Sequence, residues 1–154
     1  MTPPAQDRDL GILIGLAYQQ FVRELNAWHH EQGFDDLGRS DGYVFRQLAE
    51  GPSTVSALAT RLGITKQGAG QIVDDMRRRG YVEQRPDPTD KRARQLTLTE
   101  RGQAALKAAR TFHRTFERRL VREHGKESVQ RLRELLGAIA GHTEEVAPRP
   151  PAPL

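Results

Sequence analysis

Residues 54–98 read TVSALATRLGITKQGAGQIVDDMRRRGYVEQRPDPTDKRARQLTL, and the first part of this run predicts two short helices that meet at a tight corner. Gly63 follows the first helix, where a left-handed backbone is needed and glycine adopts it without steric cost. Thr65 is the expected cap of the second helix, because its hydroxyl can accept a hydrogen bond from an N–H group of the first turn. The apolar residues expected to hold the two helices together are Leu58, Ala59, Leu62, Ile64, Ala69 and Ile72.

The second part of the run predicts a β-hairpin with a long, charged tip. Residues 81–85 alternate like a strand, residues 86–90 break the alternation with PDPTD, and residues 95–98 resume it. Lys91, Arg92 and Arg94 fall in the tip beside Asp90, where a loop cannot bury them. A solvated turn alone would explain such charges. A hairpin directly after a helical corner is more typical of a wing that reaches a phosphate backbone or a minor groove.

Four runs of this sequence, residues 66–76, 79–83, 87–94 and 96–102, resemble the MarR family of winged helix-turn-helix transcriptional regulators. The most specific part is the wing signature, in which an Asp-x-Arg is followed by a strand ending in Leu-Thr and a helix opening on Thr-x-x-Gly. The resemblance covers nearly the whole chain. It implies an obligate homodimer, a DNA-binding lobe in each subunit, and often a small-molecule or redox signal that releases DNA.

The expected fold class is mainly α with a small β-hairpin wing, as a winged helix-turn-helix lobe plus N- and C-terminal dimerisation helices. Residues 1–145 are expected to form a single MarR-like domain, with the winged helix-turn-helix at about 40–98 and the dimerisation helices at about 9–32 and 99–145. These terminal helices carry more apolar surface than the lobe can cover, so we expect them to pair with a second copy; the alternative is a monomeric helical cap. Residues 146–154 are proline-rich and are expected to form a disordered tail.

Composition agrees with a small regulator and excludes several kinds of site. The chain has 154 residues, of which 36% are hydrophobic and 29% are charged, and its formal charge of +4 favours a polyanionic partner. The absence of cysteine excludes disulfide bonds, thiolate zinc sites and a thiol-based sensor. We find no apolar run of membrane-spanning length and no signal peptide, so no membrane partner is expected and the cytoplasm is the default location.

The residues expected to contact DNA follow from the position of the second corner helix. A recognition helix presents its N-terminal half to the major groove, and Gln67 and Gln71 lie four residues apart on one face, where a glutamine amide can pair with the edge of adenine. Lys66 is expected to contact a phosphate. The predicted DNA-binding residues are Ser53, Thr54, Thr65, Lys66, Gln67, Gly68, Gly70, Gln71, Arg77, Lys91, Arg92 and Arg94.

The resemblance further implies that Arg92 at the wing tip enters a minor groove and that Asp90 orients it, while Arg94 holds a phosphate. Gly68 and Gly70 each cost a helix about 1 kcal/mol relative to alanine. Either the bare backbone lets the helix approach DNA closely, or one of the two glycines packs tightly against the neighbouring helix. The run 77–79 of three arginines ends the helix and is expected mainly to stabilise its C-terminus, with Arg77 as a phosphate ligand.

An effector site is also implied by the resemblance, in a cleft between the dimer helices and the DNA-binding lobe. The residues that could line it are Tyr18, Trp28, His29, Tyr43 and His113, which would suit a small aromatic effector such as a flat phenol, although an aromatic residue on an apolar stripe is more often ordinary core. The spacing of the histidines and aspartates 29, 30, 35, 36 and 113 matches no metal-ligand pattern, so we predict neither a metal nor a cofactor.

The sequence thus predicts a sequence-specific, DNA-binding transcriptional regulator. We expect a repressor that acts as a homodimer on a pseudo-palindromic operator in double-stranded DNA and is released by a small-molecule ligand. The alternative is a winged-helix module that binds protein or RNA without operator specificity. An enzyme is not expected, because no Gly-x-Gly-x-x-Gly, Gly-x-Ser-x-Gly or His-Glu-x-x-His run occurs.

Overall fold

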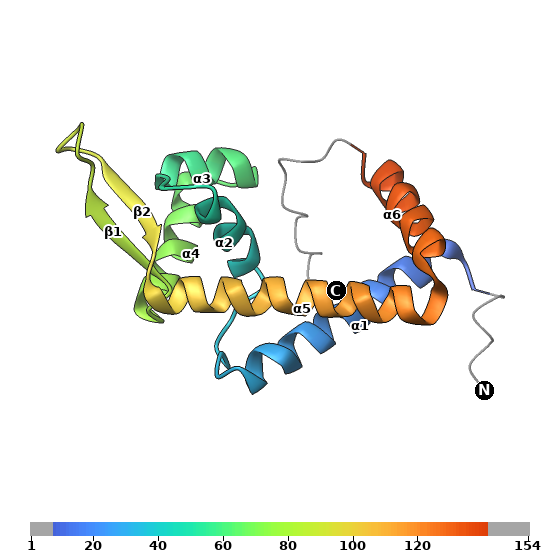
Figure 1. The fold of residues 1–154 in the computed structure, drawn as a ribbon. Coiled ribbons are helices and arrows are strands. Elements are labelled where there is room, and N and C mark those ends of the chain that lie inside the picture. The colour runs from blue at the N-terminus through green and yellow to red at the C-terminus, as the bar shows by residue number, and fades with distance from the viewer. Residues whose placement is uncertain (1–7, 142–154) are drawn as a thin grey trace. The chain divides into compact units, whose positions relative to one another are not determined.

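The chain is mostly helical, with one two-stranded antiparallel hairpin, as the sequence predicts (Figure 1). The computed structural model describes residues 8–141, so the proline-rich segment 146–154 lies outside the described residues. The chain divides into two units, one ending at Leu37 and the other beginning at Gly38. Each is described by itself.

The first unit consists of one long helix and a short loop. Helix α1, Leu10–Glu31, has the bounds that the apolar periodicity predicts to within a residue or two. It ends where Gly33 takes a left-handed backbone (φ +85°) and the Phe34 N–H donates to the His29 carbonyl at 2.8 Å. The His30 side chain at the end of α1 contacts the carboxylate of Asp35 in the loop. Several large apolar side chains of α1 are nevertheless exposed, including Leu10 and Ile12.

The second unit contains the remaining helices and both strands. Its elements are α2 (Asp41–Ala49), α3 (Val55–Leu62), α4 (Lys66–Arg78), β1 (Val82–Pro86), β2 (Arg94–Leu98), α5 (Glu100–His124) and α6 (Lys126–Ala140). Helix α5 packs against α2, with β2 at its beginning and α6 at its end (Figure 1). The core lies where α2, α3, α4 and the base of the hairpin meet, and its largest fully buried side chains are Tyr81, Leu58, Met76, Leu96, Val44 and Val73.

The corner between α3 and α4 is built as predicted. The Thr54 hydroxyl accepts from the Ala57 N–H at 3.1 Å, Gly63 adopts the left-handed conformation (φ +62°), and the Thr65 hydroxyl accepts from the Gly68 N–H at 3.0 Å. Of the residues expected to hold this corner together, Leu58, Ala59, Leu62 and Ala69 are buried and Ile72 is half-buried. Ile64 is 39% exposed, because it belongs to the turn rather than to the packed face of either helix.

The hairpin pairs β1 with β2 in antiparallel register from Val82 opposite Leu98 to Pro86 opposite Arg94. Its base is anchored by a further bridge, in which the Ser53 N–H donates to the Leu96 carbonyl at 3.1 Å and the Leu96 N–H donates to the Ser53 carbonyl at 2.7 Å. Leu96 is fully buried, so the base of the wing belongs to the core.

The connection from the hairpin to α5 depends on a single threonine. The Thr99 hydroxyl accepts from the Gly102 N–H at 3.0 Å, which caps α5, and donates to the Gly80 carbonyl at 2.5 Å. The Thr99 N–H also donates to the Tyr81 carbonyl at 3.1 Å. Gly102 lies directly on that Tyr81 carbonyl, since a Cβ atom added there would overlap the carbonyl oxygen and come within 3.3 Å of Leu98 Cδ2. The glycine of the Thr-x-x-Gly pattern is therefore required because α5 lies close to the backbone of Tyr81, just before β1.

A buried ion pair joins the beginning of α2 to the end of α4. Arg79 donates to both carboxylate oxygens of Asp41, at 2.6 and 3.1 Å, and to Asp75 at 2.6 Å. The Asp41 side chain is 3% exposed and also accepts from the Gly38 N–H at 2.7 Å. Ser40 precedes α2 but makes no side-chain capping bond.

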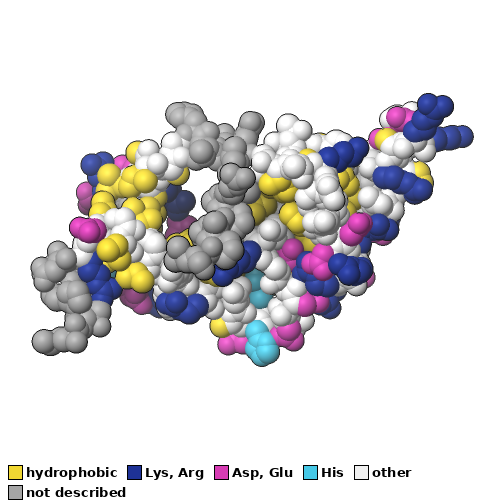
Figure 2. All heavy atoms as spheres, turned by 180° about the vertical axis from the view of Figure 1, so that it is seen from behind, with side chains coloured by type: hydrophobic (Ala, Val, Ile, Leu, Met, Phe, Trp, Pro, Cys, Tyr) yellow, Lys and Arg dark blue, Asp and Glu magenta, His cyan; other side chains and the backbone are white. Residues whose placement is uncertain are grey.

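Helix α6 packs against the end of α5 but leaves its apolar residues in solvent. Leu132, Leu135, Leu136 and Ile139 are all between 43% and 61% exposed. Part of this surface is visible over α6 in Figure 2. Within residues 8–141, no helix combines the length and the apolar character needed to cross a membrane.

Candidate nucleic-acid interface

Helix α4 buries one face and presents the opposite face to solvent. Ala69, Val73 and Met76 are buried against the lobe. In a helix of 3.6 residues per turn, the opposite side then carries Gln67, Gln71, Asp74 and Arg78, and all four side chains are exposed. The two glutamines predicted for base contacts therefore lie together on the solvent face.

The first turn of α4 concentrates hydrogen-bond donors. The Thr65 cap satisfies the Gly68 N–H, while Lys66 and Gln67 project into solvent from the first two helical positions. The N-terminus of a helix carries partial positive charge, which attracts anions such as phosphate. Thr65 and Lys66 are thus suitably placed for the phosphate contacts that the sequence predicts.

Neither glycine of α4 packs tightly against the neighbouring helix. A Cβ atom at Gly70 would meet only Val55 Cγ1 of α3, at 4.0 Å, which is ordinary contact. A Cβ atom at Gly68 would lie 3.1 Å from Thr65 Oγ1, which belongs to the cap of α4 itself. Close helix packing therefore does not account for Gly70, and an approach of the bare backbone to DNA stays a prediction.

Just before α3, Ser53 and Thr54 present hydroxyl groups that could donate to a phosphate. Ser53 is one of the predicted DNA contacts, and its N–H donates to the Leu96 carbonyl. Only the Ser53 hydroxyl remains for this role. Thr54 uses its oxygen as an acceptor for Ala57, which leaves its hydroxyl proton available to donate.

Two aspartates organise the wing tip from within. Asp87 accepts from the Thr89 N–H at 2.8 Å, from the Thr89 hydroxyl at 2.7 Å and from Gln95 at 3.2 Å. These bonds, led by the one from the Thr89 N–H, lower the pKa of the Asp87 carboxyl. Asp90 accepts from the backbone N–H of Arg92 at 2.9 Å, so it fixes the local backbone of Arg92 rather than pairing with its guanidinium.

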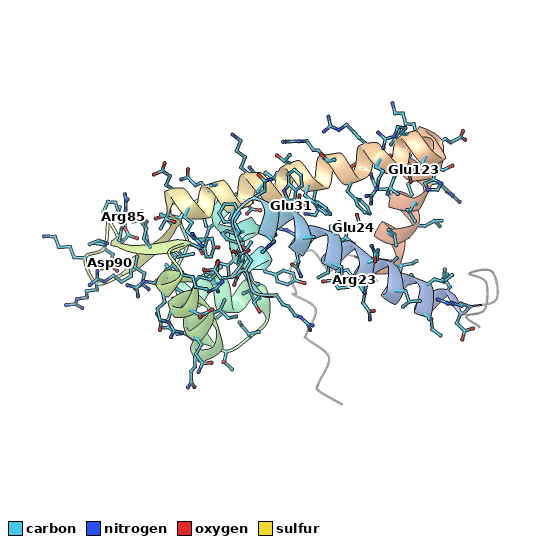
Figure 3. All side chains as sticks on the ribbon, turned by 90° about the horizontal axis from the view of Figure 1, so that it is seen from below. Arg23, Glu24, Glu31, Arg85, Asp90 and Glu123 are labelled. Atoms are coloured by element: carbon cyan, nitrogen blue, oxygen red, sulfur yellow. The ribbon has the colours of Figure 1, made fainter. Side chains whose placement is uncertain are left out.

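The cations of the wing tip are fully available to a partner. Lys91, Arg92 and Arg94 are exposed, and no ion pair within residues 8–141 occupies them. Lys and Arg side chains gather at the outer end of the hairpin in Figure 2. The view in Figure 3 shows side chains around the labelled Arg85 and Asp90 pointing outward from the hairpin. Arg85 itself pairs with Glu83 at 2.6 Å.

A groove of about 900 Å³ lies between α4 and β1. It is lined from the helix by Gln71, Asp74, Arg77 and Arg78, from β1 by Val82, Glu83 and Gln84, and at its end by Gly80 and Thr99. None of these residues except Gln71 and Arg77 was predicted to contact DNA. Helical periodicity could have indicated Asp74 and Arg78, because they lie on the same exposed face of α4 as Gln71.

The three consecutive arginines at the end of α4 have three different environments. Arg79 is the partly buried partner of Asp41, whose hydrogen bonds are the main cause of a raised Arg79 pKa. Arg77 lies 3.5 Å from Asp74 and Arg78 lies 3.4 Å from Asp75, in exposed pairs. Such pairs contribute little to stability, so Arg77 and Arg78 can exchange their carboxylates for phosphates.

The residues predicted to line an effector site are distributed over both units. Tyr18 is exposed, Trp28 is half-buried and His29 is buried on α1 in the first unit. In the second unit Tyr43 is half-buried on α2, while partial burial and the charge of Arg46 lower the pKa of His113 on α5. Among residues 8–141, no three histidine, aspartate or glutamate side chains are placed to hold a metal ion together.

Comparison with known proteins places this geometry among transcriptional regulators. The MarR family profile matches residues 35–93. The chain is 31% identical over 105 residues to the HTH-type transcriptional regulator PetP of Rhodobacter capsulatus, a match that covers 68% of this chain and 63% of PetP. It is 32% identical over 92 residues to the transcriptional regulator HosA of Escherichia coli, covering 59% of this chain and 67% of HosA.

A solved structure of CouR extends the likeness to nearly the whole chain. CouR is a transcriptional repressor whose structure was determined bound to a 23-mer DNA duplex. It superposes with a TM-score of 0.69 at 24% identity, over 92% of this chain and 99% of CouR. At this level of identity the likeness establishes the fold.

Proposed function

The chain belongs to the MarR family of transcriptional regulators, and on that premise we propose that it binds double-stranded DNA as a homodimer and represses transcription. The observation that carries the proposal is the pairing of an exposed polar face on α4 with a wing tip whose cations Lys91, Arg92 and Arg94 are all exposed. A helix in a major groove and a basic hairpin beside it would use both surfaces at once. The fold shared with the DNA-bound repressor CouR supports the same interpretation.

Each predicted contact has a distinct role in this proposal. Gln67 and Gln71 read base edges from the exposed face of α4, whereas Lys66 holds a phosphate at the start of the helix. Arg92 enters a minor groove, where a narrow, A·T-rich duplex concentrates negative potential and attracts arginine without base-specific hydrogen bonds. Arg94 holds an adjacent phosphate. The remaining predicted contacts are Ser53, Thr54, Thr65, Gly68, Gly70, Arg77 and Lys91.

Replacing Arg92 and Gln71 by alanine should affect binding in different ways. Arg92→Ala should weaken binding to operator and scrambled duplexes alike, about tenfold, because it removes a contact that does not depend on the base. Gln71→Ala should leave non-specific affinity nearly unchanged and relax preference at particular bases, by roughly 1–3 kcal/mol of discrimination.

Titration of both variants on an operator and on a scrambled duplex of equal length makes the comparison. Arg85→Ala is a suitable control on the same hairpin, since Arg85 is already paired with Glu83. An Arg92→Ala protein that keeps full affinity for both duplexes would contradict the role of the wing.

Dimerisation is supported by the apolar side chains that the described residues leave exposed. They occur on α1, as Leu10, Ile12 and Leu16, and on α6, as Leu132, Leu135, Leu136 and Ile139. Contiguous exposed apolar surface usually marks an interaction site. Sedimentation should therefore give a dimer at micromolar concentration, and a stable monomer would refute this part of the proposal.

Release by a small aromatic effector completes the proposed regulator. The candidate residues are Tyr18, Trp28 and His29 in the first unit and Tyr43 and His113 in the second. Aromatic side chains with a few polar groups are the chemistry by which proteins bind flat molecules. An effector would act by favouring a spacing of the two lobes that does not fit DNA. Addition of such a molecule should raise the melting temperature and lower duplex affinity together. A ligand that stabilises the protein without releasing DNA would count against this mechanism.

A further inference from the structure

Asp74 is a carboxylate on the exposed face of α4, the same face that carries Gln67 and Gln71. It lies three residues after Gln71 and seven after Gln67, so the three side chains follow one face of the helix. Its side chain is 67% exposed and lines the groove between α4 and β1 together with Gln71. If the proposed recognition helix enters a major groove, this carboxylate enters with it.

A carboxylate in that position opposes binding to DNA in general. Its charge repels the phosphates on both sides of the groove, over distances shorter than the screening length of about 10 Å at 0.1 M salt. Arg77 lies 3.5 Å away, but both side chains are exposed to solvent, so the pair is weak and free to separate. The remaining side chains on this face of the helix are neutral glutamines or the cation Arg78.

The chemistry of a carboxylate restricts which bases can offset that repulsion. An ionised aspartate can only accept hydrogen bonds. In the major groove the donors are the exocyclic amino groups of cytosine N4 and adenine N6, whereas guanine and thymine present acceptors that repel it. A glutamine amide tolerates both kinds of group, but an aspartate does not.

We infer that Asp74 is a specificity-determining residue, which accepts a hydrogen bond from an exocyclic amino group, above all cytosine N4, beyond the bases read by Gln71. It lowers affinity for all other sequences. This inference rests on the proposed DNA-binding function. The competing role for Asp74 is structural, as the partner that orients Arg77 toward a phosphate.

Base-preference profiles distinguish these roles. Duplexes selected from a random pool by the wild-type protein are varied one base pair at a time, and their affinities are measured for wild type, Asp74→Asn and Asp74→Ala. Glu127→Gln on α6 is the control, because it removes the same charge from an exposed position far along the second unit. All three variants change exposed side chains and should fold as the wild type does.

We expect Asp74→Ala to lose about tenfold discrimination at one base pair in each half-site, and Asp74→Asn to shift preference there toward adenine. Both variants should bind scrambled duplexes more tightly than wild type and Glu127→Gln. Unchanged profiles, or a uniform loss of affinity on every sequence, would overturn the inference about Asp74 but not the proposed DNA-binding function. Failure of the wild-type protein to bind any duplex would overturn the proposed function and this inference with it.

Discussion

Gly102→Ala should destabilise the protein by about 3 kcal/mol or more, because an added methyl group has nowhere to go. Its carbon would overlap the Tyr81 carbonyl oxygen, lie 3.1 Å from the carbonyl carbon and 3.3 Å from Leu98 Cδ2. The obstacle is backbone, so it cannot rotate away. Helix α5 would have to move off the base of the wing, which would break the bonds from Thr99 to Gly80 and Tyr81.

Thermal unfolding followed by circular dichroism measures this effect at one fixed protein concentration. The melting temperature of Gly102→Ala should fall by roughly 10 °C or more. Gly137→Ala is the matched control, because Gly137 lies within α6 and a Cβ atom there would meet nothing within 4 Å. That control should be neutral or stabilising, since alanine is the better helix former. Equal melting temperatures for the two variants would contradict the close approach of α5 to Tyr81.

Arg79→Ala should be the second severe substitution, with a loss of about 3–5 kcal/mol. It would leave the Asp41 carboxylate, which is 3% exposed, without the guanidinium that compensates its charge. Arg79→Lys should recover only part of the loss, because an ammonium group cannot reproduce the two-pronged contact at 2.6 and 3.1 Å. Combining Asp41→Asn with Arg79→Ala should also recover stability, since the buried charge is then gone.

Arg78→Ala is the natural control for this series. Arg78 is the preceding residue, but its side chain is 77% exposed and its pair with Asp75 spans 3.4 Å. Its loss should cost less than about 1 kcal/mol. Urea unfolding of the set gives the free energies directly. Similar losses for Arg78→Ala and Arg79→Ala would show that the buried pair has no special role.

Most of the fold could be predicted because helix caps, turn glycines and helical periodicity depend on residues that are close together in the sequence. Thr54, Thr65 and Thr99 each accept from an N–H group three residues away, and the cap predicted at Thr65 forms as expected. Gly63 likewise takes the left-handed backbone that its position predicts. Helical periodicity then gave the long helices, because a buried face must repeat every three or four residues.

The features that escaped prediction depend on contacts between distant segments. Asp41 and Arg79 are 38 residues apart, and nothing near either residue indicates their pairing. The bridge that commits the Ser53 N–H to Leu96 likewise forms only when α3 meets the hairpin. For the interface, the exposed glutamines and the wing cations could be predicted from local patterns. The groove, and the position of Asp74 in it, could not be predicted, because the groove forms only where α4 and β1 come together in the fold.

The most direct test of the central claim is to let the full-length protein select duplexes from a random pool, with structured RNA as competitor. A dimer that places two recognition helices in successive major grooves should enrich an imperfect inverted repeat with half-sites about 10 bp apart. RNA should compete poorly. No enriched sequence, or equal binding to RNA, would contradict the assignment of α4 and the wing to operator recognition.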